Sequence, residues 1–248
     1  MRNLTKTGVF INSKIGKAIH DYDLIEDDDR ILVGVSGGKD SLTLLTLLAE
    51  IRKWAPVRFE LVAAHVISDL QPENEEHISF LTKVFKDLKI EYRFKNIKVI
   101  DEERKVTCFW CSWNRRKALF EMADELKCNK LALAHHKDDI VETMLMNLIY
   151  NGEISAINPR QELFRGKITI IRPLCYVEES MTEKFAGERG FSEFTCDCPF
   201  ERDTRRAFIK NFIREAEENG SKMNIKTNIF KSIARIKQEY IGLKEEKG

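Results

Sequence analysis

The sequence predicts an α/β fold, a doubly wound parallel sheet with additional helices toward both ends of the chain. The first observation is that short apolar runs, typical of buried strands, alternate with longer segments of helical apolar spacing. The second is the length of 248 residues, which is enough to bury a sizeable core. The third is a polar segment with two glycines directly after the first predicted strand, where parallel sheets bind ligands.

The predicted elements follow one another in a regular order. Strands are expected at 30–35, 59–67, 91–96 and 130–134. Helices are expected at 42–54, 75–88, 113–126 and 139–150. Composition and motifs divide the chain into an N-terminal helical segment, a central α/β domain and a C-terminal segment with cysteines and basic helices, at 1–29, 30–195 and 196–248. Because βαβ units make strands parallel, the residues after each strand are expected to share one edge of the sheet.

Composition limits the class of protein. Hydrophobic residues make up 43% of the chain and charged residues 33%, a balance typical of globular proteins. No run approaches the roughly 18 apolar residues of a membrane span, and the N-terminus lacks a signal-peptide pattern. The net charge is only +1, so any surface for nucleic acid must be local. We therefore expect a cytoplasmic location and read the six cysteines as reduced thiols, metal ligands or catalytic groups.

The segment SGGKDS lies between the first strand and the next helix. Its glycines let the backbone turn tightly and approach a ligand, and the helix N-terminus adds positive potential. Hydroxyl groups and Lys39 suit phosphate, whereas the carboxylate of Asp40 indicates a bridging Mg²⁺. The pattern is not a Walker A loop, and a plain glycine turn would not need all six residues. We predict a nucleotide-binding loop made of Val35, Ser36, Gly37, Gly38, Lys39, Asp40 and Ser41, with Lys39 and Asp40 catalytic.

A second polar segment follows the strand at 130–134. Asp138 and Asp139 are expected to hold Mg²⁺ or to position a reacting oxygen, although one of them is also a natural helix cap. His135 is expected beside a phosphate group, where it would offset negative charge during the reaction. His65 and Asp69 follow the second strand, near the expected nucleotide base, and a structural role is the alternative for both.

The cysteines form two small groups and two isolated positions. Cys108 and Cys111 form a C-x-x-C pair predicted to lie just before a helix, and Cys196 and Cys198 lie much later in the chain. Four cysteines would close a tetrahedral zinc site, whereas three would hold an iron–sulfur cluster with one open iron. A redox pair also fits C-x-x-C. The isolated positions, predicted to be core residues, are Cys128 and Cys175.

The C-terminal segment has a local excess of positive charge. Residues 199–237 contain ten Lys or Arg and five Asp or Glu, which leaves +5 in a predicted helical region. A phosphate-backbone contact surface is one interpretation, and a solvated helical face is the other.

SGGKDS resembles the pyrophosphatase loop of the N-type ATP pyrophosphatases, a family that cleaves ATP between its α and β phosphates. Further stretches are similar to the tRNA 2-thiocytidine synthetase family (TtcA type): IHDYDLIEDDDRILVGVSGGKDS, CFWCSWNRRKAL, LALAHHKDDIVETMLMN and IIRPLCYV. They run in order over roughly residues 19–213, and the C-x-x-C run ending in Arg115 and Arg116 is the most diagnostic. Lysidine synthetases share the ATP loop but lack these cysteines.

The resemblance implies an ATP- and Mg²⁺-dependent tRNA thiolase with a [4Fe–4S] cluster. A base carbonyl in tRNA, that of cytidine 32, would be adenylated, and sulfur carried on the open iron would replace its oxygen. Cys108 and Cys111 match two cluster ligands, and the third matches best at Cys198, with Cys196 as the alternative. The implied partners are tRNA, a sulfur donor (sulfur from a cysteine desulfurase, or free sulfide) and, as an option, a second copy in a homodimer.

Arginines near these cysteines are the expected tRNA contacts. Arg115 and Arg116 would clamp a phosphate or the activated base, and an exposed basic helix turn is the alternative. Arg205 and Arg206 lie in the basic C-terminal region and are predicted to contact tRNA.

Departures from the family pattern keep three other functions open. The Cys198-Pro199-Phe200 run is closer to the 2-thiouridine synthetases, so thiolation is better supported than the choice of base. A persulfide on Cys108 or Cys198 would deliver sulfur without a metal. Four cysteines holding zinc would instead give a nucleotide-dependent tRNA-binding protein without thiolation.

Overall fold

The computed structural model describes residues 4–70, 74–100, 107–191, 204–219 and 224–237. Contacts divide the chain into two compact units. The first unit comprises residues 1–137 and 158–202, and the second comprises residues 138–157 and 203–248. The sequence-based division placed boundaries at 29 and 195, whereas the contacts group 138–157 with the C-terminal helices. None of the described helices is long and apolar enough to cross a membrane.

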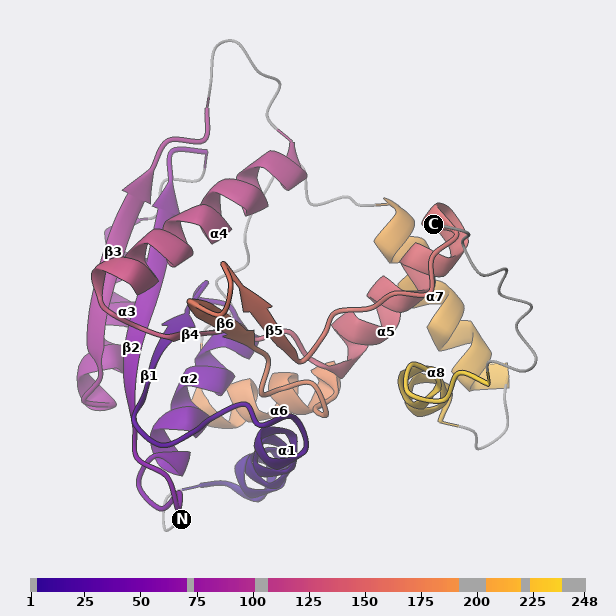
Figure 1. Ribbon diagram of the computed structural model, residues 1–248, viewed down its shortest axis with the longest axis horizontal. Coiled ribbons are helices and arrows are strands. Elements are labelled where there is room, and N and C mark those ends of the chain that lie inside the picture. Colours follow the sequence, from indigo (N-terminus) through magenta and orange to yellow (C-terminus); the bar gives the residue numbers. More distant parts are fainter. Residues whose placement is uncertain (1–3, 71–73, 101–106, 192–203, 220–223, 238–248) are drawn as a thin grey trace. The chain divides into compact units, whose positions relative to one another are not determined.

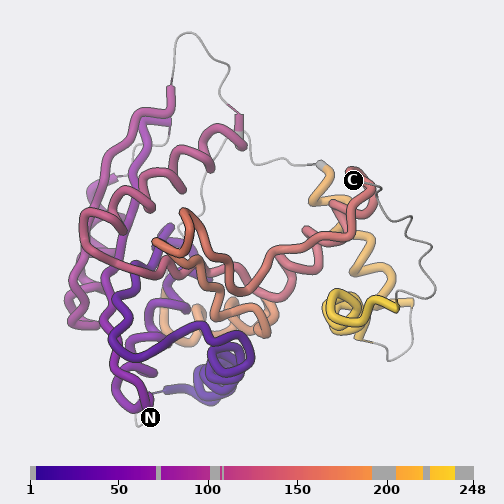
Figure 2. The backbone as a smooth tube through the Cα atoms, in the orientation of Figure 1, coloured from indigo at the N-terminus to yellow at the C-terminus, as the bar shows by residue number. Residues whose placement is uncertain are grey.

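The first unit is built on a six-stranded sheet with the order β3-β2-β1-β4-β6-β5 (Figure 1). The strands are β1 (Asp29–Gly34), β2 (Phe59–Ser68), β3 (Glu91–Ile97), β4 (Lys130–Ala132), β5 (Arg160–Leu163) and β6 (Ile168–Ile171). All neighbouring pairs are parallel except β5 with β6, which is antiparallel. The predicted doubly wound α/β class is confirmed, with one antiparallel edge strand that the sequence did not indicate. Figure 2 traces the described backbone in the same orientation.

Helices cover both faces of this sheet. Those of the first unit are α1 (Lys6–Tyr22), α2 (Lys39–Ile51), α3 (Glu75–Asp87), α4 (Cys108–Glu125) and α6 (Glu179–Arg189). Figure 1 shows α4 lying across the strands, and its apolar side chains join the core formed by β1, β2, β4 and β6. Contacts of α2 with α6, and of α1 with both, place these three helices together on the other side. The carboxyl ends of the parallel strands remain open to a ligand.

Side-chain caps explain where several helices begin. The Oγ1 atom of Thr5 accepts the Gly8 N–H at 3.1 Å at the start of α1. Asn74 accepts the His77 N–H at 2.8 Å at the start of α3. Thr107 accepts the Trp110 N–H at 3.2 Å and starts α4.

The second unit is helical. Its elements are α5 (Lys137–Met146), the π-helical turn η1 (Asn147–Asn151), α7 (Thr204–Asn219) and α8 (Ile225–Ser232). Val141 and Leu145 of α5 pack against Ile209 and Ile213 of α7 in a small core. Burial of these apolar side chains holds the three helices of the unit together.

Candidate functional site

The phosphate loop joins β1 to α2 and is closed by its own hydrogen bonds. The Val35 N–H donates to the Ala64 carbonyl of β2 at 2.8 Å, which continues the pairing beyond the end of β1. The Ser36 N–H donates to Ser41 Oγ at 3.2 Å, and Ser41 Oγ donates to the Gly38 carbonyl at 2.9 Å. Because Gly38 occupies the N-cap position of α2, no N-cap side chain accepts a hydrogen bond from the first N–H groups of this helix. The loop is therefore preformed, with a helix N-terminus of the kind that binds anions.

Gly37 is required by two independent features of this loop. Its φ is +88°, in the region that favours glycine. A Cβ atom at this position would also lie 2.3 Å from Nε2 of His77, a buried residue of α3. His77 packs edge-on against His65, with ring centroids 5.7 Å apart. The sequence predicted the turn but not that α3 closes against it.

Asp40 lies at the first turn of α2 with three polar neighbours. Its carboxylate accepts a hydrogen bond from the buried hydroxyl of Thr182 in α6. Lys39 Nζ lies 3.2 Å from the Asp40 carboxylate and 3.1 Å from that of Glu179. His136 Nε2 is 3.9 Å from Asp40. Burial disfavours the charged form of Lys39, but Asp40 and Glu179 outweigh this and raise the Lys39 pKa, so the lysine stays a cation.

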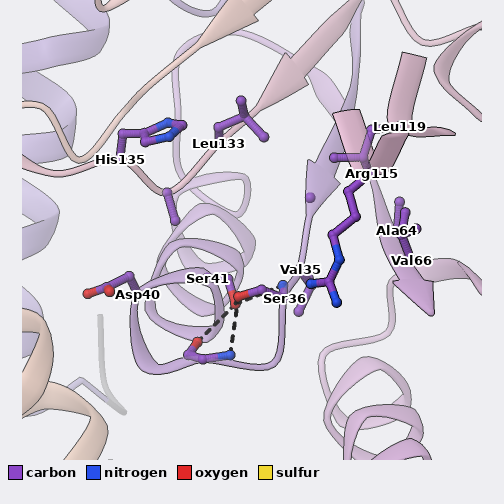
Figure 3. A pocket seen from close by; sticks show the side chains of 13 residues that line it. Val35, Ser36, Asp40, Ser41, Ala64, Val66, Arg115, Leu119, Leu133 and His135 are labelled. Carbon is purple, nitrogen blue, oxygen red and sulfur yellow. Dashed lines mark hydrogen bonds between the residues drawn. The ribbon is translucent and has the colours of Figure 1, made fainter. Parts of the chain in front are cut away.

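A cavity of about 290 Å³ opens beside the loop at the carboxyl ends of β1 and β4 (Figure 3). Its lining includes Ser36, Asp40 and Ser41 of the loop, His135 after β4, and Arg115 of α4. Figure 3 shows the Arg115 side chain directed toward Val35 and Ser36, while Asp40 and His135 lie on the other side of the cavity. Arg115 also donates to Ser68 Oγ at 3.3 Å. The volume is at the lower end of small-molecule pockets, which are about 300–1,000 Å³.

The C-x-x-C pair lies inside a helix, which corrects the expectation that it precedes one. Helix α4 begins at Cys108, five residues before the predicted start, and Cys111 is half-buried in its first turn. The Cys111 N–H donates to the Thr107 carbonyl at 3.0 Å. Arg115 lies one turn farther along, so one helix joins the cysteine pair to the cavity.

The remaining predicted ligands, Cys196 and Cys198, lie outside the described residues. Within the described part of the chain, no three His, Cys, Asp or Glu residues are grouped as a metal site. The two isolated cysteines are core residues, as predicted. Burial raises the pKa of the Cys128 thiol to about 11 and that of Cys175 to about 12, so neither is a ready thiolate.

Asp138 and Asp139 lie within the first turn of α5, because the helix begins at Lys137. Neither therefore precedes the helix as a cap, which corrects the sequence-based alternative. Asp138 pairs with Lys226 Nζ at 2.7 Å, and Asp139 pairs with Arg206 at 3.3 Å. Within the second unit, both carboxylates are thus bound to basic residues of α7 and α8.

His65, Arg205 and Arg206 make specific contacts. His65 is buried, and its Nδ1 lies 2.6 Å from the Val35 carbonyl, which ties β2 to the start of the loop. Arg205 stacks over Tyr150 at 5.1 Å from the ring centroid, and Arg206 also lies 3.4 Å from Glu142. Asp69 accepts the Val99 N–H at 2.7 Å, which matches its structural alternative.

Arg172, directly after β6, is a buried cation that sequence reasoning did not assign. Only 4% of its surface is exposed, and its Nε has no hydrogen-bond partner among the described residues. Burial, together with the nearby charge of Arg116, lowers the pKa of Arg172 to about 10. The sequence does show this arginine in the stretch IIRPLCYV. Its burial could not be predicted, because the strand before it, β6, was not predicted.

Sequence comparison places this arrangement among known proteins. A family model described as a PP-loop domain matches residues 9–217. The tRNA-cytidine(32) 2-sulfurtransferase of Herminiimonas arsenicoxydans is 39% identical over 230 residues, which cover 90% of this chain and 71% of that protein. The enzyme of the same name from Janthinobacterium sp. (strain Marseille) is 37% identical over 239 residues, which cover 94% and 74%.

Structural comparison agrees with the sequence matches. The U34-tRNA thiolase NcsA from Methanococcus maripaludis, solved with its [4Fe–4S] cluster, superposes with a TM-score of 0.74. The superposition covers 91% of this chain and 76% of NcsA, at 25% identity. The similarity thus extends over the described fold and is not limited to the loop.

Proposed function

The chain belongs to the family of PP-loop tRNA 2-sulfurtransferases, and from this premise we propose that it makes 2-thiocytidine at position 32 of tRNA, using ATP. One observation supports assigning this activity to the cavity beside the phosphate loop. The cavity beside the phosphate loop is also lined by Arg115, which lies one helical turn after Cys111. The proposal therefore assigns ATP cleavage to this cavity and sulfur transfer to the cysteine pair on the same helix. We place this activity in the cytoplasm, with tRNA and a sulfur donor as partners and a second copy of the chain as an optional one.

The first step activates the base. The C2 carbonyl oxygen of cytidine attacks the α-phosphorus of ATP, the bond between the α- and β-phosphates breaks, and pyrophosphate leaves. The preformed loop supplies backbone N–H groups and the α2 N-terminus to the phosphates. Asp40, oriented by Thr182, would hold Mg²⁺ against the departing pyrophosphate. His135, at the opposite side of the cavity from Arg115, would offset charge on the α-phosphate. Asp138 and Asp139 are proposed as further carboxylate ligands for Mg²⁺.

The second step replaces oxygen by sulfur. Sulfide attacks C2 of the adenylated base, and AMP leaves with the original oxygen. Cys108, Cys111 and Cys198 are proposed to hold a [4Fe–4S] cluster, which when bound would present sulfur on its open iron. The donor chemistry fits, because soft thiolates are the ligands such clusters take and Cys111 lies half-buried in the first turn of α4. Arg115 and Arg116, with Arg205 and Arg206, are proposed to hold tRNA.

Metal content and product identity together test the proposal. The protein is purified under strict anaerobiosis, and its iron, sulfide and zinc are measured. It is then incubated with ATP, Mg²⁺, sulfide and unmodified tRNA, and the nucleosides are analysed by mass spectrometry. We expect about four irons per chain and 2-thiocytidine that disappears when cytidine 32 is replaced by uridine.

Each alternative has its own result in this experiment. Stoichiometric zinc without a thiolated product indicates a tRNA-binding protein. A thiolated product from metal-free protein indicates a persulfide mechanism. A 2-thiouridine product contradicts the assignment of the base while preserving thiolation.

A further inference from the structure

The outer face of α4 exposes aromatic side chains. Phe109 exposes 77% of its surface and Trp113 exposes 46%. They are four residues apart, so they lie on the same side of the helix. Exposed aromatic residues that gather on one face mark an interaction site more often than isolated ones do. Neither residue lines the cavity beside the phosphate loop.

Trp113 is held in place by its neighbours. Its ring stacks on that of Trp110, with centroids 5.4 Å apart and an angle of 9° between the planes. The Trp110 indole Nε1–H in turn donates to the Val99 carbonyl at 3.2 Å. A side chain ordered in this way loses little entropy when a flat partner binds. The stack is therefore suited to a planar ligand.

The same stretch of α4 is positively charged. Residues 108–120 contain three basic residues and no acidic residue. Lys117 Nζ lies 5.8 Å from the centroid of the Trp113 ring, and it also lies 3.9 Å from Glu121. Arg116 is exposed and has no ion pair with any described residue. Aromatic rings interleaved with cations are typical of surfaces that bind single-stranded nucleic acid.

This face is distinct from the catalytic face of the same helix. At about 100° per residue, Phe109 and Trp113 point roughly 140° and 180° away from the mean direction of Cys111 and Arg115. Arg115 faces the cavity, and Leu119 packs on the sheet core. The exposed aromatics therefore point away from both. A partner on this face would contact the outside of the helix while the reacting group occupies the cavity.

We propose that Phe109, Trp113, Arg116 and Lys117 bind unpaired anticodon-loop nucleotides next to the base being modified. Bases would stack on the two aromatic rings, and phosphates would contact the two cations. This inference rests on the proposed function, which brings an anticodon loop to α4. A second copy of the chain fits less well, because a symmetric contact of this face would bring like charges together.

RNA binding by the tryptophan variant W113A provides the test, with W54A as its matched control. Trp54 follows α2, a helix that packs with α1 and α6, and is 44% exposed, nearly the same as Trp113. A fluorescently labelled anticodon stem-loop is titrated by anisotropy at fixed salt, without ATP. We expect the Kd of W113A to rise about tenfold and that of W54A to stay within twofold. W113F, which keeps a ring, should recover most of the affinity.

Kinetics separate this role from a structural one. W113A should raise the KM for tRNA about tenfold while leaving kcat, iron content and ATP affinity unchanged. RNA binding equal to wild type in W113A would overturn the proposal. The proposal would also be overturned if W113A lost dimerisation, or lost binding to anionic vesicles, while its RNA binding stayed unchanged. The two proposals can also fail separately. If the wild-type protein makes no thiolated product but W113A still loses RNA affinity, the proposed function is contradicted while the RNA-binding surface is supported.

Discussion

The phosphate loop and the cysteine set differ in how far apart their members lie along the chain. The loop is closed by bonds between residues at most five positions apart, such as the Ser36 N–H to Ser41 Oγ bond of 3.2 Å. The proposed cysteine set combines a pair in the first turn of α4 with a third member, Cys198, which follows 87 positions after Cys111 in the sequence. A local motif carries its own geometry, whereas a distributed one depends on the whole fold to assemble it. The sequence of the loop was accordingly enough to infer its function. The sequence around the cysteines was not enough to identify the third ligand.

Removal of the Asp40 charge should have the largest effect on activity. It should impair the ATP reaction at the loop and leave the cysteine site unchanged. In Asp40→Asn, the amide oxygen can still accept the Thr182 hydrogen bond, but the negative charge for Mg²⁺ is lost. We expect pyrophosphate release in the presence of tRNA to fall by about 10²–10³-fold. Pyrophosphate is measured by a coupled assay, and iron content on the same sample should equal that of wild type.

Glu183→Gln is the matched control for this charge. Glu183 also faces Lys39, at 3.9 Å, but it does not line the cavity. Its neutralisation should change pyrophosphate release less than twofold. Substantial turnover in Asp40→Asn would contradict the role of Asp40 in the ATP reaction. Loss of the cluster in the same variant would show that the loop and the cysteine site do not act independently.

The cysteine set is tested next by comparing Cys198→Ala with Cys196→Ala. We expect Cys198→Ala to lower iron from about four per chain to less than one, and Cys196→Ala to retain it. ATP binding should remain in both variants, because the loop is closed by its own bonds. Iron and sulfide are measured on anaerobically purified protein.

Cys175→Ala serves as the control for cysteine loss as such. This thiol is fully buried in the core and lies outside the proposed ligand set, so the variant should keep its iron. Iron loss in Cys196→Ala alone would reverse the choice of third ligand. Iron loss in both would indicate four protein ligands.

The fold was predicted well where apolar patterns were long. Strands β1, β2 and β3 begin and end within one residue of expectation, because each combines a continuous apolar or alternating run with clear flanking turns. The antiparallel pair β5 and β6 was missed, because each strand has only four residues and β5 is mostly polar. Helix α4 was predicted too short, because its first turn contains cysteines and aromatics rather than a helical apolar pattern.

The site shows the same limit. The glycines and serines of the loop were identified from a six-residue run, and Gly37 does have positive φ. His77, which closes against Gly37, lies 40 positions away, and no local pattern indicated it. Thr182 lies 142 positions from Asp40 and looks like any helical threonine in the sequence. Contacts between distant elements need the sheet order, and that order was not available from periodicity.

Substitution of Thr182 is expected to have the smallest effect on activity. It tests the comparison directly, because Thr182 is far from the loop in the sequence but hydrogen-bonds to Asp40 within it. Thr182→Val keeps the shape of a fully buried side chain but removes the hydroxyl that hydrogen-bonds to Asp40. The carboxylate would then be less well oriented toward Mg²⁺, so we expect kcat for pyrophosphate release to fall about tenfold. The KM for tRNA should not change, and Thr182→Ser should restore most of the rate.

Thr43→Val is the matched control, because Thr43 is also fully buried and its hydroxyl has no hydrogen-bond partner among the described residues. Removal of an unsatisfied hydroxyl costs little, so this variant should be at least as stable as wild type and fully active. Thr182→Val should instead lose about 1 kcal/mol of unfolding free energy along with the rate. If both variants match wild type in kcat, Thr182 does not orient Asp40, and the loop depends only on its own six residues. A tenfold loss confined to Thr182→Val would instead show that even the local motif is completed by α6, a helix far away in the sequence.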